Sequence, residues 1–95
     1  MAYNGNVTLI AGTWTQLTAN DVTTMPRVQN LGAGDIVVQA TIGAAPGSQD
    51  GGIYLRRYDL IDGISALSAW FGGVTSGVRI WAYSTTPGLA SVSHV

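Results

Sequence analysis

The stretch VQNLGAGDIVVQATI, residues 28–42, decides the fold class. Two mainly apolar runs, 28–31 and 36–42, flank a glycine-rich segment at 32–35, which predicts a β-hairpin. Within the second run, alternate residues fall on opposite faces of an extended strand. One face carries Ile36, Val38, Ala40 and Ile42, and the other carries Val37, Gln39 and Thr41. This period of two predicts a strand with one buried face.

Short runs rich in Thr, Val, Ile, Trp and Tyr continue on both sides of this stretch, separated by turn residues. The last run is expected to pair with the run before it, across the turn Thr86-Pro87-Gly88. In residues 59–77, apolar residues recur at spacings of three and four, which is compatible with a short helix at 65–71; an extended strand or loop is the rival interpretation. Besides 28–42, strands are predicted at 7–10, 13–17, 52–58, 78–83 and 89–94, and the first run of the hairpin extends to 25–31.

These elements predict an all-β protein, a small antiparallel β-sandwich of seven to eight short strands. A closed barrel is the alternative architecture. The 95 residues correspond to a single domain, 1–95. Residues 1–6 are polar and are interpreted as an extended N-terminal arm that reaches a neighbouring molecule.

Charge is scarce along the whole chain. Only 9% of the residues are charged, against about 25% in an average soluble domain. We interpret the low charge as the property of a surface that is largely covered by copies of the chain or by partners. The alternative is that the protein is adapted to an extracellular or particle-bound location. A formal net charge of −1 argues against nucleic-acid binding, which depends on many basic contacts. No run approaches the roughly 20 apolar residues that span a bilayer, and the first residues lack a secretory signal pattern.

Residues for catalysis or metal binding are also few. His94 is the only histidine and there is no cysteine, so neither a structural zinc site nor a nucleophile–base–orienter triad is indicated. Asp59 and Asp62 lie close together and Asp50 precedes two glycines, but neither spacing is that of a calcium loop. We therefore expect no enzymatic activity, no cofactor and no bound metal.

Two strands carry aromatic and arginine side chains on one face each. If these strands are neighbours, the side chains form one mixed surface of the kind that is enriched in protein–protein interfaces, and such a surface can also bind sugars. The alternative is that this face is the core. The residues are Tyr54, Arg56 and Tyr58 in one strand and Arg79, Trp81 and Tyr83 in the other.

Three segments of the chain resemble small virion proteins of tailed bacteriophages. They are residues 7–18 (VTLIAGTWTQLT), 28–38 (VQNLGAGDIVV) and the C-terminal part from Arg79-Ile80-Trp81-Ala82-Tyr83-Ser84 to Val92-Ser93-His94-Val95. The resemblance is to capsid decoration (cement) proteins and to head-fibre or tail-fibre modules. It covers most of the chain outside residues 59–75.

The resemblance implies a structural protein on the outer capsid surface of a virion. Its partners would be the major capsid protein and copies of itself in a homotrimer, and it would clamp neighbouring capsid subunits through several weak contacts that act together. A tail, collar or head-fibre module with host-glycan binding through the Trp/Tyr/Arg face is the alternative. A generic extracellular β-sandwich binding module is a third interpretation.

Overall fold

The computed structural model describes residues 3–18, 22, 26–42, 44–48, 52–61, 71 and 78–94, with the backbone alone at residues 3 and 94. The regular structure within these ranges is entirely β, and none of them contributes a helix that could span a membrane. The strands are β1 (Tyr3–Leu9), β2 (Trp14–Gln16), β3 (Arg27–Asn30), β4 (Ile36–Thr41), β5 (Ile53–Leu55), β6 (Leu60–Ile61), β7 (Arg79–Ser84) and β8 (Gly88–His94).

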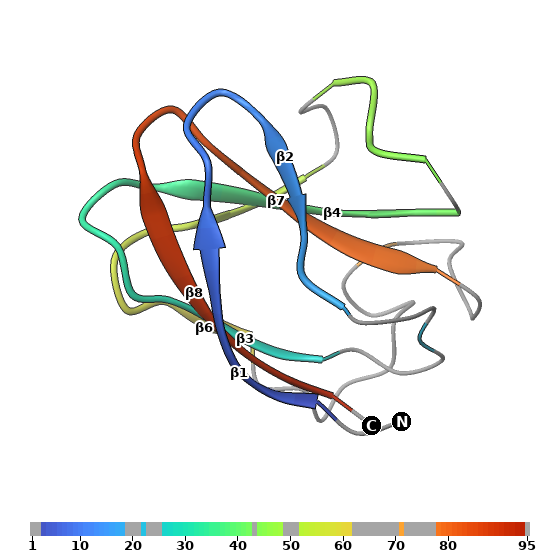
Figure 1. Ribbon diagram of the computed structural model, residues 1–95, viewed down its shortest axis with the longest axis horizontal. Helices are drawn as coiled ribbons and strands as arrows, with labels where there is room; N and C mark the ends of the chain where they lie inside the picture. Colours follow the sequence, from blue (N-terminus) through green and yellow to red (C-terminus); the bar gives the residue numbers. More distant parts are fainter. Residues whose placement is uncertain are drawn as a thin grey trace.

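The eight strands form two antiparallel sheets that pack face to face (Figure 1). The sheet with strand order β1-β8-β3-β6 is called sheet A, and the sheet with order β2-β7-β4-β5 is called sheet B. The sheets do not close into a barrel. The predicted all-β sandwich is therefore confirmed, and the barrel alternative is wrong.

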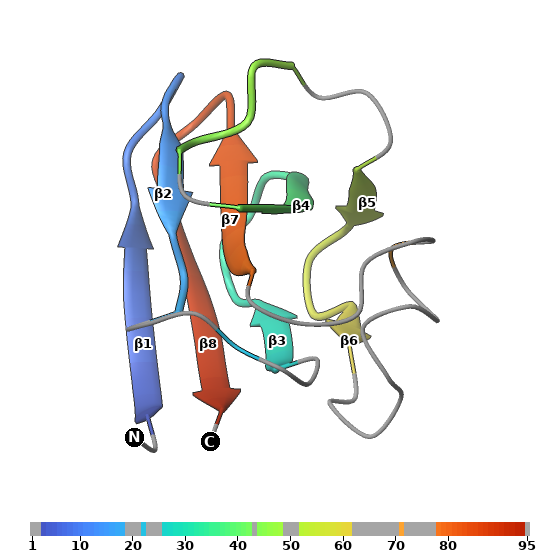
Figure 2. The same cartoon turned by 90° about the vertical axis from the view of Figure 1, so that its right-hand side faces the viewer.

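The strand order is that of an eight-stranded jelly roll. The strands pair in order from the two ends of the chain toward its middle, as in one long antiparallel ribbon. β1 pairs with β8, β2 with β7, β3 with β6 and β4 with β5. The further pairs β3–β8 and β4–β7 fold this ribbon into two sheets. This arrangement leaves β1 and β6 at the edges of sheet A, and β2 and β5 at the edges of sheet B (Figure 2).

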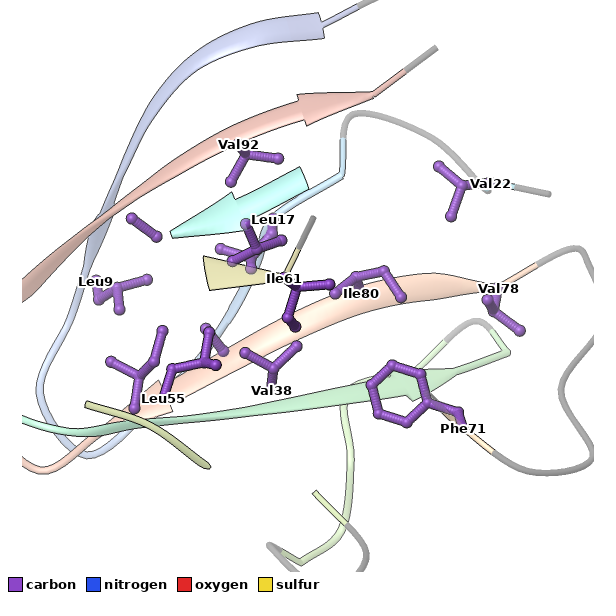
Figure 3. Close-up of a cluster of buried hydrophobic side chains, with 14 residues drawn as sticks. Leu9, Leu17, Val22, Val38, Leu55, Ile61, Phe71, Val78, Ile80 and Val92 are labelled. Atoms are coloured by element: carbon purple, nitrogen blue, oxygen red, sulfur yellow. The ribbon is translucent and has the colours of Figure 1, made fainter. Parts of the chain in front are cut away.

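The core lies between the inner faces of the two sheets. Val92 from sheet A and Ile80 and Val38 from sheet B enter it from opposite sides (Figure 3), and all three are fully buried. Phe71 packs into the same cluster from outside the named strands. Burial of these apolar side chains supplies the main driving force for folding.

The predicted hairpin at 28–42 is wrong, because β3 belongs to sheet A and β4 to sheet B. The reason is the side chain of Asn30, which is fully buried at the end of β3. Its Nδ2 donates to the carbonyl oxygens of Gly34 at 2.8 Å and Leu55 at 3.0 Å, and its Oδ1 accepts from the Gly32 N–H at 3.0 Å. These bonds hold residues 31–35 in a path that crosses from one sheet to the other.

The predicted pairing of the last two strands is also wrong. β8 pairs with β1 and β3, whereas β7 pairs with β2 and β4. The turn between them crosses the end of the sandwich. As a result, Ile80 and Ala82 of β7 face Ala90 and Val92 of β8 through the core, and all four side chains are fully buried. Side-by-side pairing would not have brought these apolar stripes face to face.

Several predicted boundaries shift. Residues 3–6, interpreted as part of an arm, instead form the first half of β1 and pair with residues 91–94 of β8. Strand 52–58 is shortened to β5, and Ile42, expected on the core face of its strand, is 82% exposed because β4 ends at Thr41. Of the helix considered at 65–71, residues 65–70 lie outside the described residues.

Candidate interaction face

The outer face of sheet B carries most of the aromatic side chains of the described strands. Along β7, Ile80 and Ala82 point into the core, so the alternate residues Arg79, Trp81 and Tyr83 lie on the outside, where each is half-buried. For β7, the alternative that the aromatic face is the core is therefore wrong. These three residues form the centre of the candidate site.

Strand register extends this centre across all four strands. The pairing places Trp14 of β2 beside Tyr83, Tyr83 beside Val37 of β4, and Val37 beside Tyr54 of β5. One row of side chains thus crosses the whole sheet on its outer side.

A second row and a third row run parallel to the first. Gln16, Trp81 and Gln39 are cross-strand neighbours, and Arg79 lies opposite Thr41. We call the complete set the aromatic face. It consists of Trp14, Gln16, Val37, Gln39, Thr41, Tyr54, Arg79, Trp81 and Tyr83.

Val37 shows how closely the rings of this face pack. It points away from the core, yet it is only 4% exposed and does not belong to the core cluster. Its cross-strand neighbours on this face are Tyr83 and Tyr54. The ring centroids of Trp14 and Tyr83 lie 5.4 Å apart with their planes inclined by 54°, a geometry that stabilises aromatic pairs by about 1 kcal/mol.

Hydrogen bonds fix the polar ends of the same face. The Trp81 Nε1–H donates to Thr41 Oγ1 at 2.8 Å, and the Thr41 hydroxyl donates to the carbonyl oxygen of Ala44 at 2.6 Å. Gln16 Nε2 donates to the Thr18 carbonyl oxygen at 2.7 Å. The Trp81 ring is thus held in one orientation, and its N–H already has an acceptor within the chain.

Of the six residues predicted from the sequence, the structure brings four together: Tyr54, Arg79, Trp81 and Tyr83. The two strands that carry them are not direct neighbours, because β4 lies between β5 and β7. Tyr54 and Tyr83 are nevertheless linked through Val37, which is the cross-strand partner of both.

The other two predicted residues lie in the turn that follows β5. Arg56 forms an exposed ion pair with Asp59, 3.6 Å between Nε and Oδ2, and Arg57 stacks over the Tyr58 ring at 4.9 Å. The strand ends at Leu55, and Tyr58 adopts a positive φ of 69°. The alternation that placed Arg56 and Tyr58 on the face of Tyr54 therefore stops before it reaches them.

Sequence reasoning missed Trp14 and Val37 as members of this face. Alternation separates Val37 from the core side of its strand, but its aromatic neighbours depend on the register of β4 with β5 and β7. Trp14 lies in the strand predicted at 13–17, for which the sequence indicates no partner strand. In β7 the aromatic residues alternate with the apolar Ile80 and Ala82, which is a signal in the sequence, but the pairing of β7 with β2 and β4 is not.

Charged groups are sparse on the described surface. Arg79 is the one charged member of the aromatic face as defined above. The described residues contain no group of three or more His, Cys, Asp or Glu side chains that could hold a metal ion. Asp50, Asp62 and the side chain of His94, considered in the sequence analysis, lie outside the described part of the chain. Among the described residues, the aromatic face is thus a surface of aromatic rings and uncharged polar side chains with one arginine.

Comparison of the chain with protein-family models, with curated proteins and with solved structures finds no match.

Proposed function

We propose that this chain is a structural virion protein that lies on the outer capsid surface and stabilises the shell by binding neighbouring capsid subunits. The contact surface in this proposal is the aromatic face of sheet B. The observation that carries the proposal is the row Trp14–Tyr83–Val37–Tyr54, which spans all four strands of the sheet without a charged residue. Tyr, Trp and Arg are the residue types that dominate binding energy at protein interfaces.

The side chains of the aromatic face are already held in place before any partner binds. This favours docking of a protein over binding of a flexible or heavily hydroxylated ligand. Side-chain ordering costs free energy on binding, and rings already held by packing and by the Trp81–Thr41 bond lose little freedom. The polar groups of Thr41 and Gln16 bond within the chain. A glycan would have to compete for those groups, whereas a flat protein surface needs mainly the ring faces.

The size of the domain supports a role that depends on repeated contacts. Its extents are 30 × 26 × 20 Å, so one face of the sandwich is about as large as the roughly 800 Å² per partner that a standard interface buries. This is the area of a standard-size interface, and area alone does not set the affinity of one contact. On a lattice, several such contacts act together and the overall affinity rises far above that of each one.

The low charge supports the same proposal. A surface with few ionic groups loses little hydration free energy when a neighbour covers it. The nine charged residues are four Arg and five Asp, and of the described ones only Arg79 belongs to the aromatic face.

The first experiment is to quantify this chain against the major shell protein in purified particles. A stoichiometry near one copy per shell subunit, or a fixed number of copies at each local symmetry axis, supports the proposal. A few copies per particle points instead to a tail, collar or fibre module, and absence from the particle contradicts the proposal.

The second experiment compares two tyrosines of similar exposure. Tyr54 on the aromatic face is 66% exposed, and Tyr58 in the following turn is 58% exposed. We expect Tyr54→Ala to weaken binding to shells that lack this protein, while Tyr58→Ala leaves binding unchanged. Equal losses for both variants contradict the assignment of the face. A glycan-array signal that Trp81→Ala abolishes supports the alternative function as a receptor-binding module.

A further inference from the structure

A different surface, the free edge of sheet A, carries an independent inference. Among the described strands four lie at sheet edges, and β1 has seven residues where β2, β5 and β6 have three, three and two. Its sequence, Tyr-Asn-Gly-Asn-Val-Thr-Leu, contains no charge and no proline. Proteins normally protect a long edge strand with charged side chains or proline, because its unpaired backbone groups are a template for another strand.

The hydrogen bonding of β8 shows which backbone groups of β1 point away from β8. The Leu31 N–H donates to the Leu89 carbonyl oxygen at 2.9 Å, so the backbone groups of Leu89 point toward β3. In an antiparallel ladder successive residues point to opposite neighbours, so those of Ala90 point toward β1 and its register partner Val7. By the same alternation, the N–H and C=O groups of Asn6 point away from β8.

Asn4 and Thr8 share this outward direction with Asn6. The side chains of all three are exposed, and none of the described strands other than β8 pairs with β1 (Figure 2). Three N–H donors and three C=O acceptors therefore line this edge in a regular order.

We propose that β1 pairs with β1 of a second copy of this chain, antiparallel and about a two-fold axis at Asn6. Asn6 then lies opposite its own copy, and Asn4 lies opposite Thr8 of the other molecule. All three become hydrogen-bonded pairs, so every outward backbone group of Asn4, Asn6 and Thr8 gains a partner. The two copies of sheet A become one continuous eight-stranded sheet.

The side chains fit this register as well as the backbone. Val7 is half-buried and packs against the core at the edge of the sheet, and Gly5 is its neighbour on the same inner face. In the dimer Val7 lies opposite Gly5 of the second copy, in a pair where side chains approach most closely. A branched side chain therefore meets a residue that has none. On the outer face, the opposed amides of Asn6 are uncharged and can bond to each other.

A second copy is favoured over a foreign strand because the sequence of β1 is complementary to itself in this register. In this register Gly5, which has no side chain, lies opposite Val7. The neutral polar Asn4 lies opposite the neutral polar Thr8. No like charges oppose each other, which would destabilise the pair. The inference does not depend on the proposed function, since β1 lies in sheet A and the aromatic face lies in sheet B.

Charge pairing across the two-fold axis provides the test. Asn6→Lys and Asn6→Asp each place like charges opposite one another in the homodimer, and Asn6 is exposed, so the fold tolerates both. By sedimentation velocity from micromolar to millimolar protein, we expect a dimer for the unmodified chain and a dissociation constant about fivefold higher for each variant. An equimolar mixture of the two variants restores the dimer, because opposite charges then meet.

The control is Leu60→Lys, on the opposite edge strand β6 of the same sheet, where the side chain is 48% exposed. It is expected to leave the dimer unchanged. Hydrogen exchange at the amides of Asn4, Asn6 and Thr8 is expected to slow as protein concentration rises. A monomer at all concentrations, a trimer in place of a dimer, or a mixture of the two Asn6 variants that fails to associate overturns the inference.

Discussion

Replacement of Asn30 by alanine tests the mechanism by which the chain crosses between the sheets. Asn30 is fully buried, and its side chain makes three hydrogen bonds, to the carbonyl oxygens of Gly34 and Leu55 and from the Gly32 N–H. At about 1 kcal/mol net for each bond, Asn30→Ala removes about 3 kcal/mol of stability. The Leu55 carbonyl bond is buried, so its loss leaves an acceptor that water reaches poorly.

This loss is a large part of the total, since small domains are stable by only about 5–15 kcal/mol. For a domain of this size a loss of about 3 kcal/mol lowers the melting temperature by roughly 12–24 °C. Urea unfolding followed by tryptophan fluorescence, together with calorimetry, measures both quantities. Asn30→Asp is expected to be worse than Asn30→Ala, because a carboxylate would face two carbonyl oxygens in a buried site.

Asn4→Ala is the matched control, because this asparagine lies on the exposed face of β1. Its effect on unfolding free energy is expected to stay within about 0.5 kcal/mol. An Asn30→Ala variant as stable as the Asn4→Ala variant refutes the reasoning, since the crossing would then be held by other contacts.

The remaining predictions concern single side chains and are all measured by urea unfolding. Thr15 Oγ1 is buried without a hydrogen-bond partner, so Thr15→Val is expected to stabilise the fold by about 1 kcal/mol; a destabilised variant contradicts this. Gly12 has a φ of 73°, so Gly12→Ala is expected to cost about 1 kcal/mol despite open space around it. Gly47 also has open space and no positive φ, so Gly47→Ala serves as its control and should be neutral or stabilising by up to about 1 kcal/mol. Trp81→Phe removes the N–H bonded to Thr41 and is expected to cost about 1 kcal/mol; no change would show that the bond is not needed to hold the ring.

Local alternation predicted which side of a strand faces the core. In β7 it separated Ile80 and Ala82 from Trp81 and Tyr83, and the burial of each residue follows that division. Alternation succeeds here because side chains of a strand must point to opposite faces, whatever the neighbouring strands are. It failed at Ile42, where the strand had already ended.

Alternation does not predict which strands pair with one another. The segment at 32–35 has the composition of a hairpin turn, but Asn30 directs it across the sandwich through bonds to Gly34 and to Leu55, 25 positions further along the chain. The burial of Asn30 is a consequence of the assembled fold and not of its sequence neighbours. For the same reason the sequence could not place Val37 between Tyr54 and Tyr83, its partners in the neighbouring strands.

The two proposed surfaces constrain one another. Antiparallel neighbours in a continuous sheet are related by a two-fold axis perpendicular to that sheet, so the inner faces of both copies of sheet A point in the same direction. Both copies of sheet B then lie on one side of the eight-stranded sheet, and their two aromatic faces point toward the same surroundings. A dimer through β1 therefore leaves the row from Trp14 to Tyr54 open in each copy and makes binding to a repeating surface bivalent. On a single isolated partner the dimer gains nothing over the monomer, so a stronger affinity for the assembled lattice than for its subunits is the combined consequence of the two surfaces.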